Sequence, residues 1–330
     1  MRIAVIGAGA VGGAFAALLD RAGHEVVVTA RGAQLEAIRT HGLALDGAWG
    51  EHLAQVTASE TLAVAPDLAI LTTKAQDARA AIAANAAALD GGTTLLVVQN
   101  GLGGTRVAQE LLPLSSVLGG LALFAASYLT PGRVTITAPL PTLLGAAPGS
   151  SRSVLDAVAQ VIGEAMPVEL VDDLEAAQWS KLLVNHVNSL PAITGLSVQE
   201  TVADPRLLDV LAASLQESIR VAEAAGVRFS PMAGLSGDEL HALGSDRRLA
   251  KNFFRGLVQG MGDVPNLGST LQSIRRGQRT EIDYLNGAVV REARLHGVPT
   301  PVNATLVALV HEVEDSGRFL DPIEVAEHVD

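Results

Sequence analysis

Near its N-terminus the chain reads Ile3-Ala4-Val5-Ile6-Gly7-Ala8-Gly9-Ala10-Val11-Gly12. The apolar run predicts a buried strand, and the apolar residues 15–19 predict a helix after the glycines. In this geometry Gly7 allows a tight turn, Gly9 lets a phosphate approach the backbone, and Gly12 lets the helix pack closely. The N–H groups and the partial positive charge of the helix N-terminus suit a pyrophosphate. We therefore expect Gly7, Ala8, Gly9, Ala10, Val11 and Gly12 to bind a dinucleotide. The alternative is a βα turn that binds nothing.

The composition indicates a globular protein with a large core. Of 330 residues, 48% are hydrophobic and 18% are charged, a length that suggests two domains or one large one. The net charge of −12 argues against a nucleic-acid partner, because phosphate backbones bind basic surfaces. The chain has no cysteine, which excludes disulfides, thiolate catalysis and zinc–thiolate sites. The eight histidines show no paired spacing such as HExxH, so we expect no metal.

Two further features of the sequence concern the compartment. No run of 18 or more apolar residues occurs, and the N-terminus enters its first strand without the layout of a signal peptide. We therefore expect a soluble, cytoplasmic enzyme that has no membrane partner.

The residue after the second predicted strand bears on the choice of cofactor. Residues 25–29 predict that strand, and Ala30-Arg31 follows it. NAD-binding units carry an acidic residue near this position for the ribose hydroxyls, and none is present here. Arg31 instead suits a ribose 2′-phosphate, which favours NADP over NAD. A solvated loop arginine is the alternative.

Polar residues follow the next two predicted strands, residues 67–72 and 94–98. Lys74 and Asn100 therefore lie at the carboxyl edge of the predicted sheet, where ligands bind in doubly wound folds. Lys74 either contacts a cofactor phosphate or is solvated. Asn100 either bonds cofactor and substrate together or only shapes the turn before Gly101.

The pattern of the chain changes near residue 172. Residues 121–145 read as a hairpin that extends the sheet, and residues 167–171 read as the last strand. Helical patterns fill the rest of the chain. The predicted fold is α/β, with a Rossmann-type doubly wound, NADP-binding domain over residues 1–172 and an all-α substrate and catalytic domain over residues 173–330.

The first helix of the second domain carries three polar residues on one face. Residues 174–190 read as this helix, and spacings of four and three place Lys181, Asn185 and Asn188 together. Polar groups on an apolar helix are costly unless they have partners. These three side chains either have a functional role or find their hydrogen-bond partners within the core. The apolar helix predicted over residues 207–225 packs inside its own domain or against a second copy, so a homodimer stays open.

Taken together, several segments resemble the ketopantoate reductases (2-dehydropantoate 2-reductases), and the resemblance covers nearly the whole chain. They are the glycine turn, Arg31, Gln99-Asn100-Gly101, Trp179-Ser180-Lys181-Leu182-Leu183-Val184-Asn185, Asn266 with Ser269, and Arg279-Thr280-Glu281-Ile282-Asp283-Tyr284-Leu285-Asn286-Gly287.

The resemblance implies reduction of the C2 ketone of a 2-oxo acid by NADPH in a cleft between the two domains. It implies that Lys181 donates a proton to the carbonyl oxygen and that Glu281 orients Lys181 or bonds the cofactor ribose. Asn100 and Asn185 would hold substrate, and Asn100 would also contact the nicotinamide. Ser269, helped by Asn266, would bind the substrate carboxylate.

The sequence departs from the family at two places that would contact substrate. The family usually carries a second asparagine four residues after the position of Asn185, whereas here Asn188 comes after three and Ser189 is fourth. An Asn-Gly-Glu-type loop is replaced by Leu196-Ser197-Val198-Gln199. We keep Asn188 among the expected substrate-binding residues. The identity of the 2-oxo acid stays open.

Three functions are therefore compared. The first is reduction of ketopantoate to D-pantoate, a step of pantothenate and coenzyme A biosynthesis. The second is reduction of a different 2-oxo acid by a paralogous enzyme. The third is an NADP-sensing binding protein without turnover, against which the presence of both Lys181 and Glu281 speaks.

Overall fold

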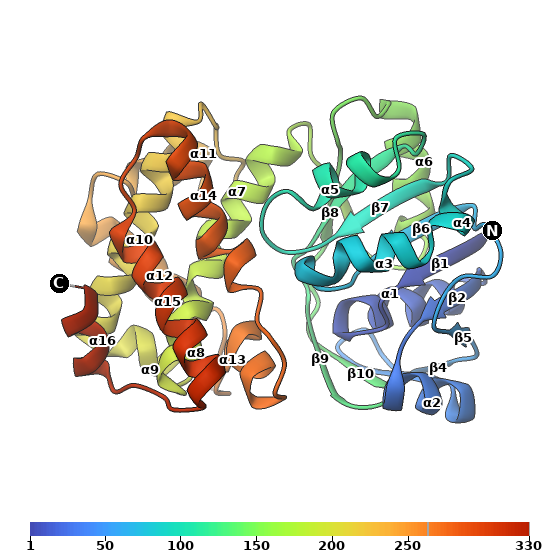
Figure 1. Ribbon diagram of the computed structural model, residues 1–330, viewed down its shortest axis with the longest axis horizontal. Helices are drawn as coiled ribbons and strands as arrows, with labels where there is room; N and C mark the ends of the chain where they lie inside the picture. The colour runs from blue at the N-terminus through green and yellow to red at the C-terminus, as the bar shows by residue number, and fades with distance from the viewer. Residues whose placement is uncertain (263, 330) are drawn as a thin grey trace. The chain divides into compact units, whose positions relative to one another are not determined.

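Strand β1 (Arg2–Ile6), the glycine turn and helix α1 (Ala10–Arg21) follow one another as the sequence predicts (Figure 1). The structure, a computed structural model, describes residues 1–262 and 264–329. The chain divides into two compact units. The N-terminal unit comprises Met1–Gln99 and Gly103–Leu174, and the helical unit comprises Asn100–Leu102 and Glu175–Asp330.

The main sheet belongs to the N-terminal unit. Its strands are β1, β2 (Glu25–Thr29), β5 (Thr57–Ser59), β6 (Leu68–Leu71), β7 (Thr94–Val98), β8 (Val117–Ala122), β11 (Thr142–Ala146) and β12 (Val168–Leu170). Their order across the sheet is β12-β11-β8-β7-β6-β1-β2-β5, and each neighbouring pair is parallel except β8–β11. The chain builds outward from β1 in one direction and from β6 in the other. This confirms the predicted doubly wound architecture and places a topological switch point between β1 and β6.

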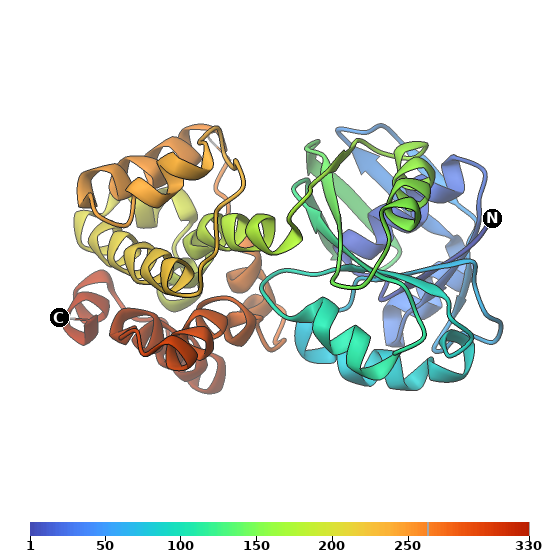
Figure 2. The ribbon, with the colours of Figure 1, turned by 90° about the horizontal axis from the view of Figure 1, so that it is seen from above.

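Helices cover both faces of the main sheet, so each face has its own core. Ile3 and Val5 of β1 pack in one core with α1 and α6 (Arg152–Gly163). Ile6 packs in the other with α3 (Ala78–Ala84), α4 (Ala86–Leu89) and α5 (Gly104–Leu111). Figure 2 shows α6 and the α3–α5 group on opposite sides of the strands. Helix α2 (Gly32–His41) packs beside β5.

A second sheet corrects one prediction. Strands β9 (Ala125–Thr130) and β10 (Arg133–Ala138) form the expected hairpin, but it joins β3 (Leu43–Gly47) and β4 (His52–Ala54) in the order β4-β3-β10-β9. It therefore does not extend the main sheet. The reason is one-sided burial: Val134 and Ile136 point into the core against α1, whereas the main-sheet strand β1 is buried on both faces.

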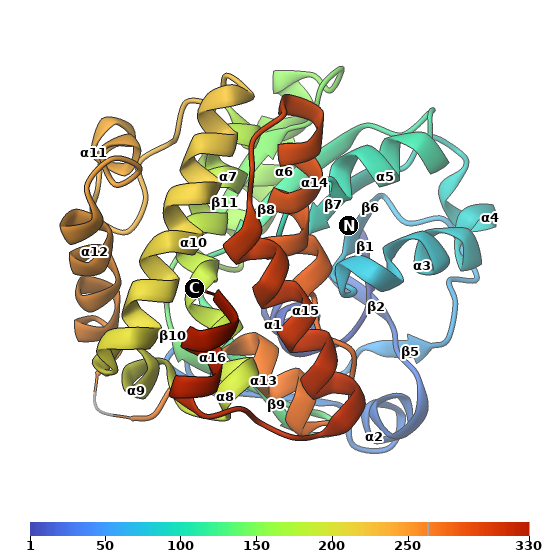
Figure 3. The same ribbon diagram turned by 60° about the vertical axis from the view of Figure 1, so that its left-hand side comes forward.

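The helical unit is built around α10 (Pro205–Ala224). This helix packs against α9 (Val198–Ala203), α12 (Arg247–Gln259), α14 (Asn286–His296), α15 (Pro301–Ser316) and α16 (Pro322–Val329). Figure 3 shows α10, α14 and α15 side by side. The helices of this half are α7 (Leu174–Asn185), α8 (Ser189–Thr194), α9 (Val198–Ala203), α10, α11 (Gly237–Ala242), α12 (Arg247–Gln259), α13 (Gly268–Arg275), α14 (Asn286–His296), α15 (Pro301–Ser316) and α16 (Pro322–Val329). Within the described residues, turns of 3-10 helix are η1 (Ala75–Asp77) in the N-terminal unit and η2 (His186–Asn188) and η3 (Ile282–Tyr284) in the helical unit. Throughout the described ranges, each helix is too short or too polar to cross a membrane.

The predicted helix over residues 174–190 is interrupted. Helix α7 ends at Asn185, the 3-10 turn η2 follows, and α8 begins at Ser189. Pro191 explains the change, because it has no N–H to donate to the carbonyl of Val187 and its ring crowds that carbonyl. Asn188 therefore lies on η2 and not on the same α-helical stripe as Lys181 and Asn185.

Candidate functional site

Two of the three motif glycines are required by the protein's own backbone. Gly7 has a φ of +103°, and a Cβ there would lie 2.8 Å from Thr73 Cγ2 and 2.9 Å from Thr73 N. A Cβ on Gly12 would overlap the carbonyl oxygen of Gly7. Within the described residues, a Cβ on Gly9 would meet no atom closer than 4 Å. Protein packing therefore explains Gly7 and Gly12, and the approach of a phosphate remains the prediction for Gly9.

Side chains from neighbouring elements hold the turn in place. Thr29 Oγ1, at the end of β2, accepts a hydrogen bond from Gly7 N at 3.1 Å. Thr72 Oγ1 donates to Gly7 O at 2.8 Å. The buried Gln34 donates from Nε2 to Ala8 O at 2.7 Å and accepts at Oε1 from Gly132 N at 2.7 Å. These anchors were not predicted from the sequence, although threonine at the carboxyl end of a strand was an available signal.

The start of α1 fits a pyrophosphate. Its N-cap residue is Gly9, which has no side chain that could cap the N–H groups of the first turn. The first-turn N–H groups of a helix have no partner within the helix, so they are donors for an anion. Ala10 and Val11 stand in this first turn.

Arg31 stands at the start of the helix that follows β2, and its contact with a ribose phosphate stays a prediction. It is the exposed N-cap residue of α2, directly after β2 and Ala30. Its guanidinium makes no ion pair or hydrogen bond with any residue of 1–262 or 264–329. The positive end of the α2 dipole adds to its charge. Lys74 follows β6 and directly precedes η1, and the residue is half-buried.

Asn100 belongs to the helical unit although it follows a strand of the N-terminal unit. Its neighbour Gly101 has a φ of +78°, and a Cβ there would overlap the carbonyl oxygen of Tyr284. The Asn100–Leu102 segment is thus seated on η3, which Glu281 directly precedes. This contact shows why glycine is needed at position 101, and it brings Asn100 to the same segment as Glu281.

Lys181 and Glu281 are oppositely charged residues of the helical unit that interact electrostatically. Both residues are half-buried, Lys181 on α7 and Glu281 at the start of η3. Burial lowers the pKa of Lys181 to about 8, while the charge of Glu281 opposes this by raising it. An ammonium with such a pKa keeps its proton at pH 7 and yet is a stronger acid than an exposed lysine. The pair can act as a proton donor with its counter-ion.

His186 is a second titratable group close to Lys181 in the chain, and its environment argues against an acid role. Its ring is fully buried, with Nδ1 donating to Leu182 O at 2.8 Å and Nε2 bonded to Ser218 Oγ at 2.6 Å. Burial lowers the pKa of His186 to about 4. The ring is therefore neutral at pH 7, with both nitrogens occupied by protein atoms.

Asn185 lies one helical turn after Lys181, on the same face of α7. Its Nδ2 atom is buried and has no hydrogen-bond partner among the described residues. A buried amide donor left without a partner costs about 1–3 kcal/mol. Such a group, next to a lysine of altered pKa, is suited to a polar ligand atom.

The structure brings together three of the predicted residues, Asn188, Asn266 and Ser269. The side chains of Asn188 and Asn266 also form hydrogen bonds with the backbone. Asn188 donates from Nδ2 to Asn185 O and accepts at Oδ1 from Ser269 N, both at 3.0 Å. Asn266 Oδ1 accepts from Gly268 N at 2.9 Å. The side chain of Asn188 therefore ties the end of α7 to the start of α13. Ser269 is exposed.

The segment 196–199, which differs from the family, holds the neighbouring loop. Gln199 Oε1 accepts from Asn266 N at 2.9 Å, and its Nε2 donates to Gly262 O at 3.2 Å and Val264 O at 2.9 Å. Val198 N donates to Asn266 O at 2.7 Å. In this protein Gln199 thus supports the backbone around Asn266. Nothing in the local sequence pattern indicated this, because the partners are more than 60 residues away.

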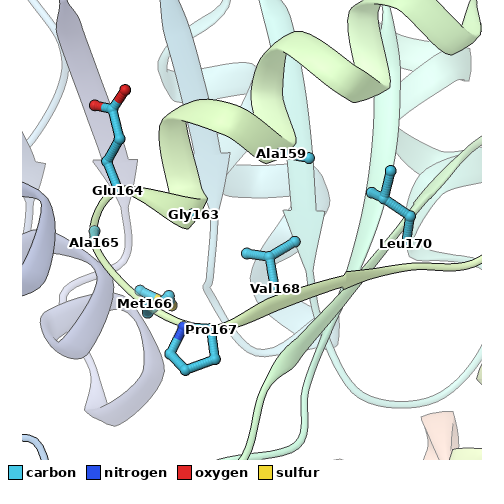
Figure 4. Close-up of a pocket in the computed structure, with 8 residues that line it drawn as sticks. All are labelled: Ala159, Gly163, Glu164, Ala165, Met166, Pro167, Val168 and Leu170. Atoms are coloured by element: carbon cyan, nitrogen blue, oxygen red, sulfur yellow. The ribbon is translucent and has the colours of Figure 1, made fainter.

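A separate hollow of about 570 Å³ lies at the end of α6 and along the edge strand β12 (Figure 4). It is lined by Ala159, Gly163, Glu164, Ala165, Met166, Pro167, Val168 and Leu170. Its one charged side chain among the described residues, Glu164, lies 3.4 Å from His24 Nε2. The lining offers no cation to polarise a carbonyl, so we do not place the reaction here.

Two parts of the chain match one protein family. Residues 3–149 match "Ketopantoate reductase PanE/ApbA", and residues 173–314 match "Ketopantoate reductase PanE/ApbA C terminal". A 2-dehydropantoate 2-reductase of Archaeoglobus fulgidus is 31% identical over 315 residues, which is 95% of this chain and 98% of the relative. Another, from Halobacterium salinarum, is 30% identical over 325 residues, 96% of this chain and 100% of the relative.

Solved structures show the same architecture. A crystal structure of a PanE/ApbA family ketopantoate reductase from Ralstonia eutropha gives a TM-score of 0.82 at 31% identity, covering 96% of this chain and 99% of that one. A structure of D-mandelate dehydrogenase with NADH and anilino(oxo)acetate gives a TM-score of 0.80 at 24% identity, with the same coverage. At that identity the likeness to D-mandelate dehydrogenase concerns the fold.

Proposed function

The chain belongs to the ketopantoate reductase family of 2-oxo acid reductases, and from this premise we propose that it reduces 2-dehydropantoate (ketopantoate) to D-pantoate with NADPH. This reaction belongs to pantothenate and coenzyme A biosynthesis. The observation that carries the proposal is the placement of Lys181 as a half-buried ammonium on α7 that interacts electrostatically with the half-buried Glu281 before η3.

The residues of the chain have distinct tasks in this reaction. When bound, NADPH would supply the hydride that reduces C2 of the substrate. Lys181 Nζ holds a proton, stabilises the negative charge that grows on the carbonyl oxygen, and then donates the proton to that oxygen. Glu281 keeps Lys181 charged and oriented. Asn185 Nδ2 donates to substrate, and the Ser269 hydroxyl, in the first turn of α13 beside Asn266, binds the carboxylate.

Cofactor binding falls mainly to the N-terminal unit. The backbone of residues 7–12 and the N-terminus of α1 would hold the pyrophosphate, with Lys74 near it. Arg31 would bind the ribose 2′-phosphate, a pairing supported by its exposure and by its lack of a protein partner in the described ranges. Asn100 and Glu281 would contact the nicotinamide end of the cofactor.

A different 2-oxo acid is the second candidate substrate. Asn188 and Gln199 stand at places where the family is expected to hold substrate, yet in this chain both side chains are bonded to backbone atoms of neighbouring segments. This difference from the family supports a substrate of different shape. The solved D-mandelate dehydrogenase, whose ligands are NADH and anilino(oxo)acetate, is a related fold with such a substrate class.

Initial rates over a panel of 2-oxo acids, each with NADPH and with NADH, test these candidates. We expect ketopantoate with NADPH to give the highest kcat/KM. If ketopantoate ranks below a bulkier or aromatic 2-oxo acid, the second candidate replaces the first. If NADPH binds tightly but no 2-oxo acid consumes it, the protein is instead a non-catalytic NADP sensor.

A further inference from the structure

Glu314, on α15, contacts the segment that carries Glu281. Its side chain is 4% exposed and accepts hydrogen bonds from Thr280 N at 2.7 Å, Arg279 Nη1 at 2.8 Å and His311 Nδ1 at 2.9 Å. Burial opposes ionisation of this carboxyl, but the hydrogen bonds from Arg279, Thr280 and His311 outweigh burial and lower the pKa of Glu314 to about 2. Glu314 is therefore a carboxylate throughout the pH range of an enzyme assay.

The bond to Thr280 N holds a stretch of irregular backbone directly before Glu281. Residues 277–281, all within the described chain, lie outside any helix or strand. Thr280 directly precedes Glu281, and the Glu281 carbonyl accepts from Tyr284 N at 2.8 Å to begin η3. The backbone of Glu281 is thus held from one side by Glu314 and from the other by its own turn.

His311 extends this support to the residues after Glu281. Its Nδ1 bonds Glu314 Oε2 at 2.9 Å, and its Nε2 bonds Asp283 Oδ1 at 3.0 Å. Two carboxylate acceptors require both ring N–H groups, which only the imidazolium has. Partial burial works against this charge, but hydrogen bonds to Glu314 and Asp283 raise the pKa of His311. The cluster therefore fixes both Thr280 and Asp283, which flank Glu281.

We propose that Glu314 is a positioning residue for the Lys181–Glu281 pair. By holding the Thr280 N–H, its carboxylate sets where the Glu281 side chain stands relative to Lys181. The effect on turnover rests on the proposed function, whereas the effect on the pair itself is independent of which substrate is reduced.

The protonation of Lys181 reports the position of Glu281 directly. The chain has three lysines, Lys74, Lys181 and Lys251, so protein labelled with 13C-lysine gives three titrating NMR signals, and Lys181→Arg identifies the relevant one. Because the Glu281 charge raises the pKa of Lys181, Glu314→Gln should lower it by about half a unit or more. Glu281→Gln should do the same.

The double variant and a matched control separate positioning from other effects. If Glu314 acts through Glu281, Glu314→Gln has no further effect on Lys181 in a Glu281→Gln background. Asp315→Asn removes a second carboxylate that is paired with Arg279, in an exposed ion pair of 2.8 Å with no bond to Thr280, and should leave the pKa of Lys181 unchanged. An unchanged Lys181 pKa in folded Glu314→Gln, or an additive shift in the double variant, would overturn the proposal.

Turnover provides the second measurement. We expect Glu314→Gln to lower kcat by about tenfold with little change in KM. If Glu314→Gln does not fold, His311→Ala takes its place, because this half-buried ring bridges Glu314 to Asp283. In that case an unchanged Lys181 pKa in His311→Ala refutes the idea. If the wild-type protein reduces no 2-oxo acid, the proposed function fails while the NMR titration still decides the role of Glu314.

Discussion

The glycine turn of the N-terminal unit and the end of α7 in the helical unit are both candidate binding regions, but they are built differently. In the turn, Gly7 and Gly12 are required because a Cβ would collide with nearby protein atoms. At the end of α7, the buried Nδ2 of Asn185 has no hydrogen-bond partner in the described chain. The amide of Asn188, in contrast, is hydrogen-bonded to backbone atoms. Ligand binding at the glycine turn depends on the shape of the backbone. Ligand binding at the end of α7 depends on which side chains have no hydrogen-bond partner within the protein. The two regions should therefore respond differently to mutation.

The largest expected effect is on turnover. Lys181→Ala removes the proton donor, so kcat should fall by at least ~100-fold while the Kd for NADPH changes little. Stopped-flow hydride transfer and fluorescence titration with NADPH measure the two quantities separately. Near-normal turnover would remove Lys181 from the acid role.

The turn should respond through stability as well as binding. Gly12→Ala places a Cβ against the Gly7 carbonyl, and overpacking of this kind costs about 1–3 kcal/mol, so the free energy of unfolding and NADPH affinity should both fall. Gly9→Ala meets no protein atom among those described, so it should weaken NADPH binding with an unchanged Tm. Equal Tm losses in the two variants would show that protein packing, and not a phosphate, requires Gly9.

The structure of the glycine turn could be predicted from the sequence more fully than that of the end of α7, for a physical reason. Strand, turn and helix follow one another in the chain, and β2 and β7 begin and end at the predicted residues. The bonds of Gln34 to Gly132 and of Asn188 to Ser269 join residues about 100 and 80 positions apart, and such contacts leave no local pattern. The pairing of β10 with β3 was missed for the same reason. Lys181 and Glu281, also far apart in the chain, were identified by resemblance to the family and not by spacing.

A variant of Arg31 tests the preference for NADPH over NADH that we expect of the N-terminal unit. Arg31→Ala removes a charge-assisted hydrogen bond worth about 1.5–3 kcal/mol, so the Kd for NADPH should rise by roughly 10- to 100-fold while that for NADH changes little. Isothermal titration with both cofactors gives the two values. If both weaken equally, Arg31 does not bind the 2′-phosphate, and NADH becomes the better candidate.

The pH dependence of the rate depends on Lys181 in the helical unit. A proton donor must be protonated, and the pKa of Lys181 is about 8, so the single-turnover rate should be constant below that pH and fall about tenfold per unit above it. Glu281→Gln removes the charge that raises this pKa, so its fall should begin at lower pH. A rate that stays constant to pH 10 would contradict the assignment.

The two asparagines give the sharpest test of the contrast between a side chain without a protein partner and one that is hydrogen-bonded to the backbone. Asn188→Ala leaves the Ser269 N–H without its acceptor and should lower the free energy of unfolding by about 1–3 kcal/mol. Asn185→Ala removes a buried donor that has no protein partner within residues 1–262 and 264–329, so it should not lower the Tm. It should instead raise KM for the 2-oxo acid, since the amide is available to substrate. Thermal melts and initial rates on both variants decide the matter. If Asn185→Ala destabilises the protein and Asn188→Ala alters only KM, the assignment of the two side chains is reversed.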